Sequence, residues 1–387
     1  MRIVWISHVG GDSLGGAGQA LVEGAAGLVE RGVEVTVVLP SRGRLADSLE
    51  AAGASIVVLP NVWWAWPSPR SIPRRIRETA RAVVRTPVGV MRLSSFLRRA
   101  KPDLVVTNTL MSPLGAFAAR TANLAHVWYV HEFGVEDHGL QFVLGERASL
   151  GLVTRLSRLV IVNSHAVQGK YEREGRNSET CVIYNAVDVP VEPARPAVRR
   201  AELELVLVGM IATYKGQIEA VRATSILAGK GIDVRLRLVG SRAGALNWQR
   251  LTALVHELDL EERVEVVDFA QDPAPYVAAA DIVLMCSRSE AFGRVTVEAM
   301  KRGKPVIGTS SGGTVELVEG GRAGLLYPPG DHEALARQIE RLHRDDALRR
   351  ELGENGRAWA QARFTRDRHA EELLAAFARA LSRATDD

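Results

Sequence analysis

The stretch IVWISHVGGDSLGGAGQALVEGAAGLVERGVEVTVVL, residues 3–39, predicts the fold of this chain. It begins with a continuous apolar run at residues 3–7 and ends with another at residues 33–39. A glycine-rich turn at residues 10–18 and a segment of helical spacing at residues 19–31 lie between them. Strand, helix and strand in this order form a β-α-β unit with parallel strands, and continuous apolar strands indicate a sheet covered by helices on both faces.

The same pattern recurs in two series that are separated by PVEPARPAVRR, residues 190–200. This segment has three prolines and no periodicity, so we interpret it as a linker. We expect an α/β protein of two doubly wound, Rossmann-like domains, with their ligand at the carboxyl ends of the strands in the cleft where the domains face each other. The expected boundaries are residues 1–190 for the first domain, 191–200 for the linker, 201–364 for the second domain and 365–387 for a terminal helix and tail.

Composition agrees with a globular protein of two domains. The chain has 387 residues, of which 47% are hydrophobic and 24% charged, and its formal net charge of +4 is mild. No apolar run reaches the roughly 18 residues of a membrane span, and residues 1–12 resemble a first buried strand rather than a signal peptide. No metal-ligand spacing occurs, and we expect a cytoplasmic protein.

Two glutamates in SRSEAFGRVTVEAMKRGKPV, residues 287–306, mark a candidate site. The buried strand before this stretch ends near Ser287, so Glu290 should lie on a loop at the carboxyl edge of the sheet. A turn at Gly293 should precede a helix that begins near Arg294 and carries Glu298. The free N–H groups of that helix end would then form an anion site beside two carboxylates. The alternative is that Glu298 only offsets the helix dipole and Glu290 is a solvated loop residue.

Lys215 and two glycines extend this candidate site. Lys215 follows a strand at the start of a helix, where the positive end of the helix dipole makes a cation unfavourable. A bound diphosphate would make the local charge negative and the lysine favourable. Gly312 and Gly313 form a tight turn after the next predicted strand, at residues 305–308. The alternatives are an ordinary surface lysine and an ordinary turn.

Together these residues resemble the retaining, nucleotide-sugar-dependent glycosyltransferases of family 4, which have the GT-B fold and a Glu-x7-Glu motif. The resemblance covers nearly the whole chain and is most specific in the second half. It is carried by Lys215-Gly216, Ser287-x-x-Glu290-x-Phe292-Gly293, Glu298, Gly303-x-Pro305-Val306, Gly312-Gly313-x-x-Glu316 and Gly324-Leu325-Leu326, with Tyr184–Asp188 before the linker.

The resemblance implies a role for each matching residue. Glu298 would bind the ribose of the donor, Glu290 its sugar hydroxyls, and Lys215 the leaving diphosphate. Backbone N–H groups would hold sugar and diphosphate, and the terminal helix would pack toward the first domain. The other implied donor-binding positions are Phe292, Gly293, Arg294, Val295 and Thr296, with Gly15 and Gly16 in the first domain. No metal and no cofactor would be required, because the lysine and the helix ends stabilise the charge.

One position departs from the family pattern. The family usually has an arginine soon after the glycine that ends the strand, but here Gly209 is followed by Met210 and Ile211. Arg294 could supply the missing cation, a hypothesis that rests only on its position.

His131 follows an apolar strand in the first domain, and the resembling family has a histidine here close to the donor sugar. We therefore include His131 with Glu290 and Lys215 as catalytic candidates. Glu132, Asp137 and His138 are candidates for contacts with the acceptor. The alternative for His131 is a hydrogen-bonded structural histidine.

The implied activity is transfer of a sugar from a nucleoside diphosphate sugar to a hydroxyl of a glycan, a lipid-linked molecule or a small molecule. Retention of anomeric configuration follows from the resemblance alone. Two alternatives stay open, namely a nucleotide-sugar epimerase of the same fold and a non-catalytic nucleotide-sugar binding protein. Donor base, sugar, acceptor, linkage and oligomeric state are not readable from the sequence.

A basic segment defines a possible partner surface. Trp63, Trp64 and Trp66 precede ten basic residues between Arg70 and Lys101, with Glu78 the only acid. A basic amphipathic helix beside tryptophans suits an anionic membrane, which would place the protein peripherally at its inner face. The favoured alternative is a solvated, arginine-rich helix packed on the first domain. We expect no nucleic-acid partner, because no recognised binding module accompanies the charge.

Overall fold

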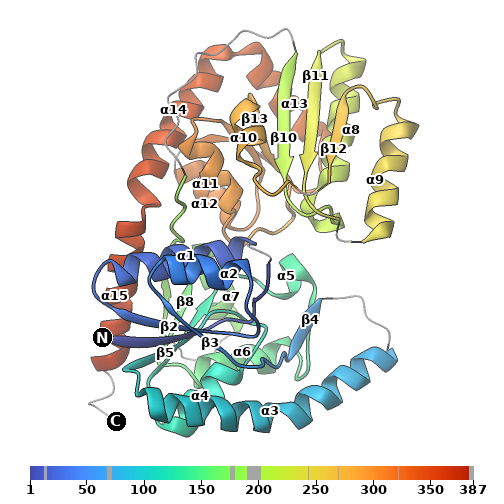
Figure 1. The fold of residues 1–387 in the computed structure, drawn as a ribbon. Helices are drawn as coiled ribbons and strands as arrows, with labels where there is room; N and C mark the ends of the chain where they lie inside the picture. Colours follow the sequence, from blue (N-terminus) through green and yellow to red (C-terminus); the bar gives the residue numbers. More distant parts are fainter. Residues whose placement is uncertain are drawn as a thin grey trace. The chain divides into compact units, whose positions relative to one another are not determined.

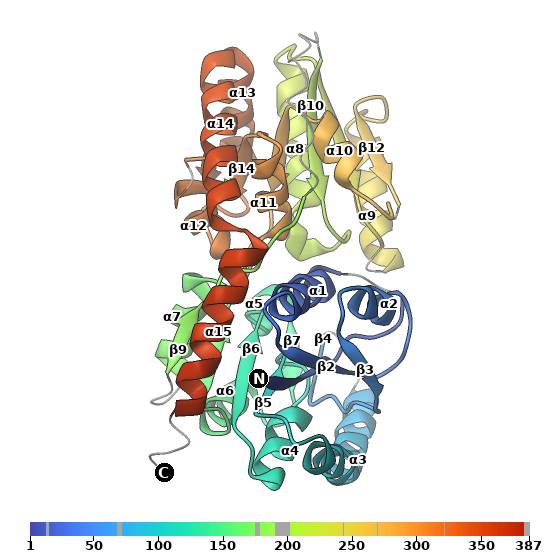
Figure 2. The same cartoon turned by 60° about the vertical axis from the view of Figure 1, so that its left-hand side comes forward.

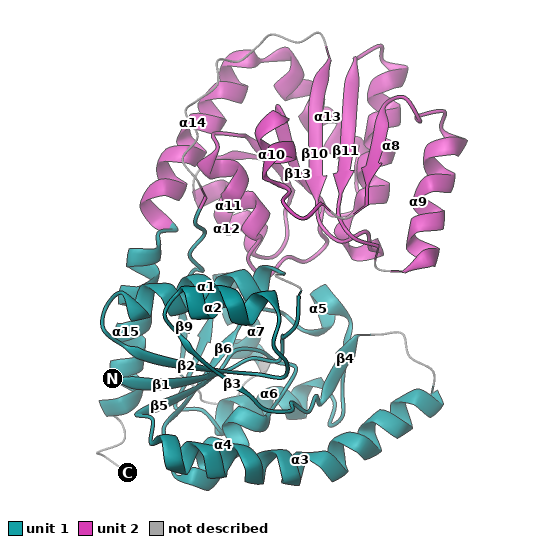
Figure 3. Ribbon diagram, in the orientation of Figure 1, with its two compact units in different colours: residues 1–188, 364–387 teal, residues 189–363 magenta. Residues whose placement is uncertain are grey.

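The computed structural model describes residues 1–12, 15–67, 72–174, 179–189, 202–242, 244–268, 270–320 and 322–382. The chain forms two compact units, shown in Figure 3. Unit 1 comprises Met1–Asp188 with Phe364–Asp387, and unit 2 comprises Val189–Arg363. The expected linker, residues 191–200, lies outside the described residues.

Unit 1 is built on a seven-stranded parallel sheet of order β3-β2-β1-β5-β6-β8-β9 (Figure 1). The strand order reverses between β1 and β5, which makes the carboxyl edge there a topological switch point. The strands are β1 (Arg2–Ile6), β2 (Glu34–Leu39), β3 (Ser55–Val58), β5 (Leu104–Thr107), β6 (His126–Val130), β8 (Leu159–Val162) and β9 (Thr180–Val182).

Helices cover both faces of this sheet, as the continuous apolar strands predict. Ile3 and Trp5 belong to the core on one face, and Val4 and Ile6 to the core on the other. The first face is covered by α1 (Gly16–Val29), α2 (Arg44–Ala51) and α15 (Arg366–Ser382), and the second by α3 (Ile72–Ala100) and α4 (Leu114–Ala122). The remaining helices are α5 (Val135–His138), α6 (Glu146–Arg155) and α7 (His165–Glu174).

The terminal helix α15 belongs to unit 1 and lies along its other elements (Figure 2). Thr365 caps its start, because the Thr365 hydroxyl accepts a hydrogen bond from the Arg368 N–H at 3.2 Å. Leu373 and Phe377 are fully buried in the core that α15 shares with α1. Helix α15 is therefore part of the hydrophobic core of the unit that also contains β1.

Unit 2 repeats the architecture with a six-stranded parallel sheet of order β12-β11-β10-β13-β14-β15. Its switch point lies between β10 and β13. The strands are β10 (Leu203–Val208), β11 (Val234–Val239), β12 (Val264–Val267), β13 (Ile282–Met285), β14 (Val306–Thr309) and β15 (Gly324–Tyr327). The helices are the short 3-10 helix Thr213–Lys215, α8 (Gln217–Gly229), α9 (Ala245–Glu257), α10 (Ala274–Ala279), α11 (Arg294–Lys301), α12 (Gly313–Gly320), α13 (His332–Arg344) and α14 (Asp346–Arg363). The expected fold class, two Rossmann-like parallel sheets with helices, is confirmed.

The tryptophan surface that the sequence suggested for a membrane is not formed. Trp64 and Trp66 are only 5% and 9% exposed, while Trp63 is 36% exposed. The reason is an unpredicted antiparallel pair, β4 (Ala65–Pro67) with β7 (Leu140–Phe142), which turns this segment inward. Trp64 donates its indole N–H to the Leu110 carbonyl at 2.6 Å and stacks on Trp128.

The basic segment itself is a long helix, α3, although Arg70 lies outside the described residues. Its C-terminal half packs through Leu93 and Leu97. Four apolar residues of its N-terminal half, Ile72, Ile76, Val83 and Val84, are 63–72% exposed. Among the described helices, none has both the length and the hydropathy needed to cross a membrane.

Candidate active site

Two of the predicted catalytic residues meet at the switch point of unit 2. Lys215 ends the short helix after β10, and Glu290 lies in the loop after the neighbouring strand β13. The Lys215 Nζ atom lies 2.8 Å from Glu290 Oε2, and the two side chains are 21% and 19% exposed. Open parallel sheets bind their ligands at such an edge. The pair is therefore reachable by solvent where a ligand is expected.

Backbone contacts between three loops hold Glu290 in place. The Arg288 N–H donates to the Tyr214 carbonyl at 3.0 Å, which links the loops after β13 and β10. The Gly313 N–H donates to the Glu290 carbonyl at 2.7 Å, which links the loops after β14 and β13. Gly312 has a φ of +60°, and a Cβ atom there would lie 2.5 Å from the Glu290 carbonyl oxygen. Only glycine fits this close approach.

The N-terminus of α11 is the third part of the site. The helix begins at Arg294 as predicted, after Gly293 in the left-handed region with a φ of +88°. No side chain caps this end, and the Thr296 N–H donates to the Gly293 carbonyl at 2.9 Å. The N–H groups that precede Thr296 in the first turn have no carbonyl within the helix to bond to. Thr296 is buried, and its hydroxyl has no hydrogen-bond partner among the described residues. The helix end therefore offers backbone donors and a positive dipole to an anion.

Glu298 lies one turn into α11 and is paired with Arg294. The Arg294 Nε atom is 3.0 Å from Glu298 Oε1, and both side chains are less than one-fifth exposed. The sequence suggested that Arg294 replaces the cation missing at Met210, and the structure places its guanidinium on Glu298. Met210 itself is 40% exposed.

Sequence reasoning missed two charged residues near this edge. Arg288 lies in the Glu290 loop with its side chain two-thirds exposed, and its Nε atom is 3.8 Å from the carboxylate of Glu219. Glu219, in the first turn of α8, also accepts a hydrogen bond from the Gly330 N–H at 3.1 Å. Arg288 stands within the SRSEAFG motif, so its position next to Ser287 was the available signal.

His131 in unit 1 lies just past the carboxyl end of β6 and is part of a polar network. Its Nε2 atom is 2.9 Å from Asn108 Oδ1, which also accepts the Trp5 indole N–H at 3.2 Å. Because the indole can only donate, Asn108 Oδ1 is an acceptor and His131 carries its proton on Nε2. Burial lowers the pKa of His131 to about 3, helped by the nearby His369 and His8. The neutral ring leaves Nδ1 as an acceptor, buried and without a partner in the described parts of the chain.

Glu132 and Asp137, the predicted acceptor contacts, use their carboxylates to shape loops. Glu132 accepts hydrogen bonds from the N–H groups of Leu110 at 2.8 Å and His131 at 2.9 Å. Asp137 accepts from the N–H groups of Phe133 and Gly134 at 2.7 and 2.8 Å. Burial raises the pKa of Glu132.

His138 and the two glycines of the first turn are more accessible. The His138 side chain is 47% exposed, with Nε2 3.9 Å from Asp137 Oδ2. Gly15 precedes α1 as its N-cap, and a Cβ atom at Gly15 or Gly16 would contact nothing within 4 Å. Among the described residues, no group of three or more His, Cys, Asp or Glu side chains could hold a metal ion.

Two protein families match consecutive parts of the chain. Residues 14–190 match the model described as "Glycosyltransferase Family 4", and residues 190–359 match "Glycosyl transferases group 1". The two matches together cover residues 14–359, which contain every strand of the two Rossmann-like sheets except β1.

Several curated bacterial proteins are similar to this chain. LpsE of Rhizobium meliloti, a lipopolysaccharide core biosynthesis glycosyltransferase, is 27% identical over 93% of this chain and 94% of its own length. CapM of Staphylococcus aureus, a capsular polysaccharide biosynthesis glycosyltransferase, is 30% identical over 43% of each chain. The N-acetyl-alpha-D-glucosaminyl L-malate synthase of Bacillus anthracis is 29% identical over 59% of this chain. The matches to these last two span 43% and 62% of the relatives' lengths.

Solved structures share the whole fold. HepE of Anabaena, determined in complex with UDP, has a TM-score of 0.78 at 25% identity and covers 98% of this chain and 100% of its own. HepE has also been determined with UDP-glucose. The sucrose-phosphate synthase of Thermosynechococcus elongatus has a TM-score of 0.76 at 23% identity and covers 98% and 99% of the two chains.

Proposed function

The chain belongs to glycosyltransferase family 4, and from this premise we propose that it transfers a sugar from a nucleoside diphosphate sugar to a hydroxyl of an acceptor. The observation that carries the proposal is the Lys215–Glu290 pair at the switch point of unit 2, beside the uncapped N-terminus of α11. A cation and a row of backbone donors suit a diphosphate, and a carboxylate suits sugar hydroxyls.

Each residue has a separate role in the proposed reaction. Lys215 stabilises the negative charge that develops on the departing diphosphate, together with the N–H groups at the start of α11. Glu290 and Glu298 accept hydrogen bonds from the sugar and from the ribose. His131 Nδ1, an acceptor on a neutral ring, receives a hydrogen bond from a hydroxyl of the transferred sugar.

The proposed chemistry retains the anomeric configuration and needs no protein nucleophile. The bond between the anomeric carbon and the diphosphate oxygen breaks, and the acceptor oxygen bonds to the same face of that carbon. The acceptor's proton passes to the leaving phosphate oxygen. Such a reaction depends on positioning and on charge stabilisation at the leaving group. NMR of the product's anomeric proton tests retention directly.

A uridine nucleotide is the first donor to test, because HepE binds UDP and UDP-glucose and resembles this chain over its whole length. The measurement is thermal unfolding with UDP, GDP, ADP, CMP or dTDP, for the wild type, Lys215→Ala and Glu298→Ala. A ligand at 100 times its Kd stabilises the folded state by about 2.7 kcal/mol. We expect UDP to raise the Tm of the wild type and both variants to lose most of that increase.

Lys230→Ala is the matched control, because Lys230 lies in unit 2 and pairs with Glu340 on the surface. It should keep the full response to UDP. If no nucleotide stabilises the wild type, the donor site is wrong. If UDP-glucose is bound but no acceptor is ever glycosylated, the protein is a binding module. If the donor sugar is epimerised without an acceptor, the reaction class is wrong.

A further inference from the structure

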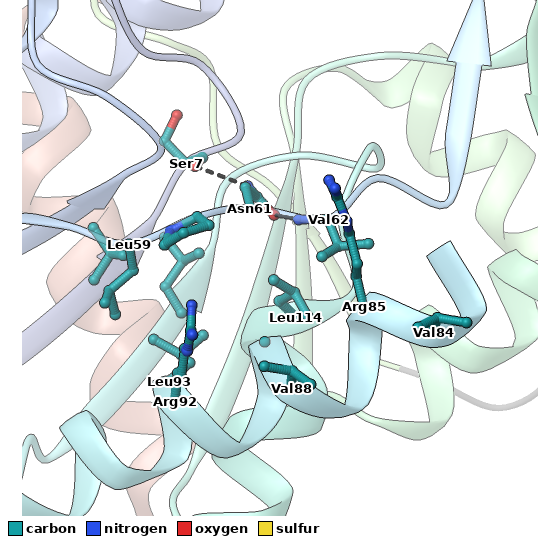
Figure 4. A pocket seen from close by; sticks show the side chains of 14 residues that line it. Ser7, Leu59, Asn61, Val62, Val84, Arg85, Val88, Arg92, Leu93 and Leu114 are labelled. Atoms are coloured by element: carbon teal, nitrogen blue, oxygen red, sulfur yellow. Dashed lines mark hydrogen bonds between the residues drawn. The ribbon is translucent and has the colours of Figure 1, made fainter. Parts of the chain in front are cut away.

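Unit 1 contains a cavity of about 400 Å³ at the carboxyl edge of its sheet (Figure 4). Ile6 and Ser7 line it at the end of β1, with Leu114 at the start of α4. The segment 59–62 after β3 and one side of α3 complete the walls. Ligand pockets of roughly 300–1,000 Å³ are typical for small molecules, and this edge is where open α/β sheets bind them.

The lining of the cavity is mainly apolar from floor to rim. Ile6, Leu93 and Leu114 form its floor and are no more than 4% exposed. Val84 and Val88 on α3 form its rim and are 72% and 43% exposed. The apolar surface thus continues from the interior of unit 1 to solvent, which suits an apolar chain that enters from outside.

Two arginines supply the only charged side chains of this lining. Arg85 and Arg92 are seven residues apart on α3, so they lie two turns apart on one side of the helix. Figure 4 shows both rising from α3 on the side of Leu59 and Val62. Neither guanidinium forms a hydrogen bond or ion pair within the described part of the chain, and no acidic residue lines the cavity.

A second, more polar hollow of about 250 Å³ adjoins the cavity and shares Asn61, Val62 and Arg85 with it. It adds the half-exposed Trp63 and the carboxylate-bearing Glu78 to the lining. Asn61 is held in place, because its Nδ2 donates to the Ser7 carbonyl at 3.1 Å and its Oδ1 accepts from the Ser112 hydroxyl. The apolar cavity therefore leads past Arg85 into the more polar hollow.

We propose that these hollows bind an amphiphilic anion, with an apolar chain in the cavity and a phosphate on Arg85 and Arg92. This identification rests on the proposed function, in which the ligand is the acceptor. The acceptor would be a hydroxyl-bearing group that a phosphate links to an apolar chain. The planar guanidinium forms paired, charge-assisted hydrogen bonds to phosphate oxygens. Both arginines are exposed, so a phosphate can reach them from solvent while the apolar chain lies in the cavity.

The test is calorimetric titration with decyl phosphate, below its critical micelle concentration. We expect wild-type protein to bind it, and Arg85→Gln with Arg92→Gln to weaken binding about tenfold or more, as for lost hydrogen bonds to a charged group. Val88→Asp should weaken it similarly by placing a carboxylate at the rim. Arg77→Gln and Val83→Asp, exposed changes on the same helix outside the cavity, are the matched controls.

Several outcomes would overturn the proposal. Equal binding of inorganic phosphate would show a simple anion site, and equal binding of decanol would show that the arginines are not used. The protein could also float with anionic vesicles, equally well in the wild type and in Val88→Asp, and yet not bind monomeric decyl phosphate. That result would show that α3 contacts a membrane surface and that the cavity is not used. The UDP response of the same samples separates the two proposals: if UDP stabilises the protein but decyl phosphate does not bind, only this inference fails.

Discussion

At the scale of single residues, the side chain of Arg294 positions the side chain of Glu298. It lies one helical turn from Glu298, and the ion pair between them is partly buried. The contact between Arg294 Nε and Glu298 Oε1 fixes the orientation of the Glu298 carboxylate beside the N-terminus of α11.

We predict that Arg294→Ala weakens binding of the donor nucleotide about three- to tenfold, on the order of 1 kcal/mol. Because the guanidinium contacts Glu298, the loss should be equal for the nucleoside diphosphate and for its nucleoside. Titration calorimetry with both ligands measures this. A loss confined to the diphosphate would instead show that Arg294 supplies the cation missing at Met210. Arg350→Ala, an exposed arginine of α14 in the same unit, is the control.

At the scale of elements, the packing of α15 against α1 depends on a small residue. A Cβ atom at Gly27 in α1 would lie 2.9 Å from Arg366 Cγ and 3.0 Å from Ala370 Cβ in α15. The two helices therefore approach each other closely at this point. The helix at the chain end is held in unit 1 partly because α1 has no side chain there.

Gly27→Ala should destabilise unit 1 by about 1–2 kcal/mol, because the cost of overpacking exceeds the usual gain of alanine in a helix. Gly151→Ala in α6, where a Cβ atom would contact nothing within 4 Å, is the matched control. It should stabilise the unit by about 0.5–1 kcal/mol. Denaturant midpoints of both variants measure the difference. If both variants are stabilised, the close contact between α1 and α15 is not as described.

At the scale of the whole molecule, the two units should respond differently to acid. Burial lowers the pKa of His126 and His131 to about 3 and of His369 to about 4. All three belong to unit 1. The described residues of unit 2 contain no fully buried histidine.

We predict that unit 1 loses stability as the pH falls from 6.5 toward 4. In this window the unfolded chain protonates these histidines while the folded state keeps them neutral, so each lowers the free energy of unfolding by up to about 1.4 kcal/mol per pH unit. Tryptophan fluorescence can follow unit 1, because it contains five of the seven tryptophans.

His369→Gln is the test variant, since glutamine can still pair with the Tyr129 hydroxyl but does not titrate. Its unfolding free energy should depend less steeply on pH than that of the wild type. Equal slopes in the two proteins would show that His369 is not held neutral by burial.

The long apolar strands and the helix starts at Arg294 and near Thr365 were predictable, because each depends on a local pattern or cap. The strands β4, β7, β9 and β15 were not predicted. β4, β7 and β9 have three residues each, too few for a periodic pattern. β15 has four residues, like the predicted β5, but begins with Gly324, a residue type that is depleted in strands. β4 and β7 are stable only because they pair with each other across more than 70 residues of chain.

The candidate donor site could be predicted from the sequence because its residues follow directly after predicted strands. Glu290 and Lys215 each follow a strand directly, and parallel strands bring their carboxyl ends to one edge. Their 2.8 Å contact follows from this topology. The ion pair between Arg294 and Glu298, the tautomer of His131 and the inward position of Trp64 depend on neighbours that only the folded chain brings close.

The sequence by itself therefore determined the two parallel sheets, the glycosyltransferase resemblance and the loop residues of the donor site. These features depend on apolar periodicity and on short motifs that act over one strand and one turn. Only the tertiary structure decided which tryptophans are buried and where the cavity beside Arg85 and Arg92 lies. The cavity is bounded by strand ends, a loop and two helices that are separated along the chain. Such a space results from packing, and no local pattern of residues encodes it.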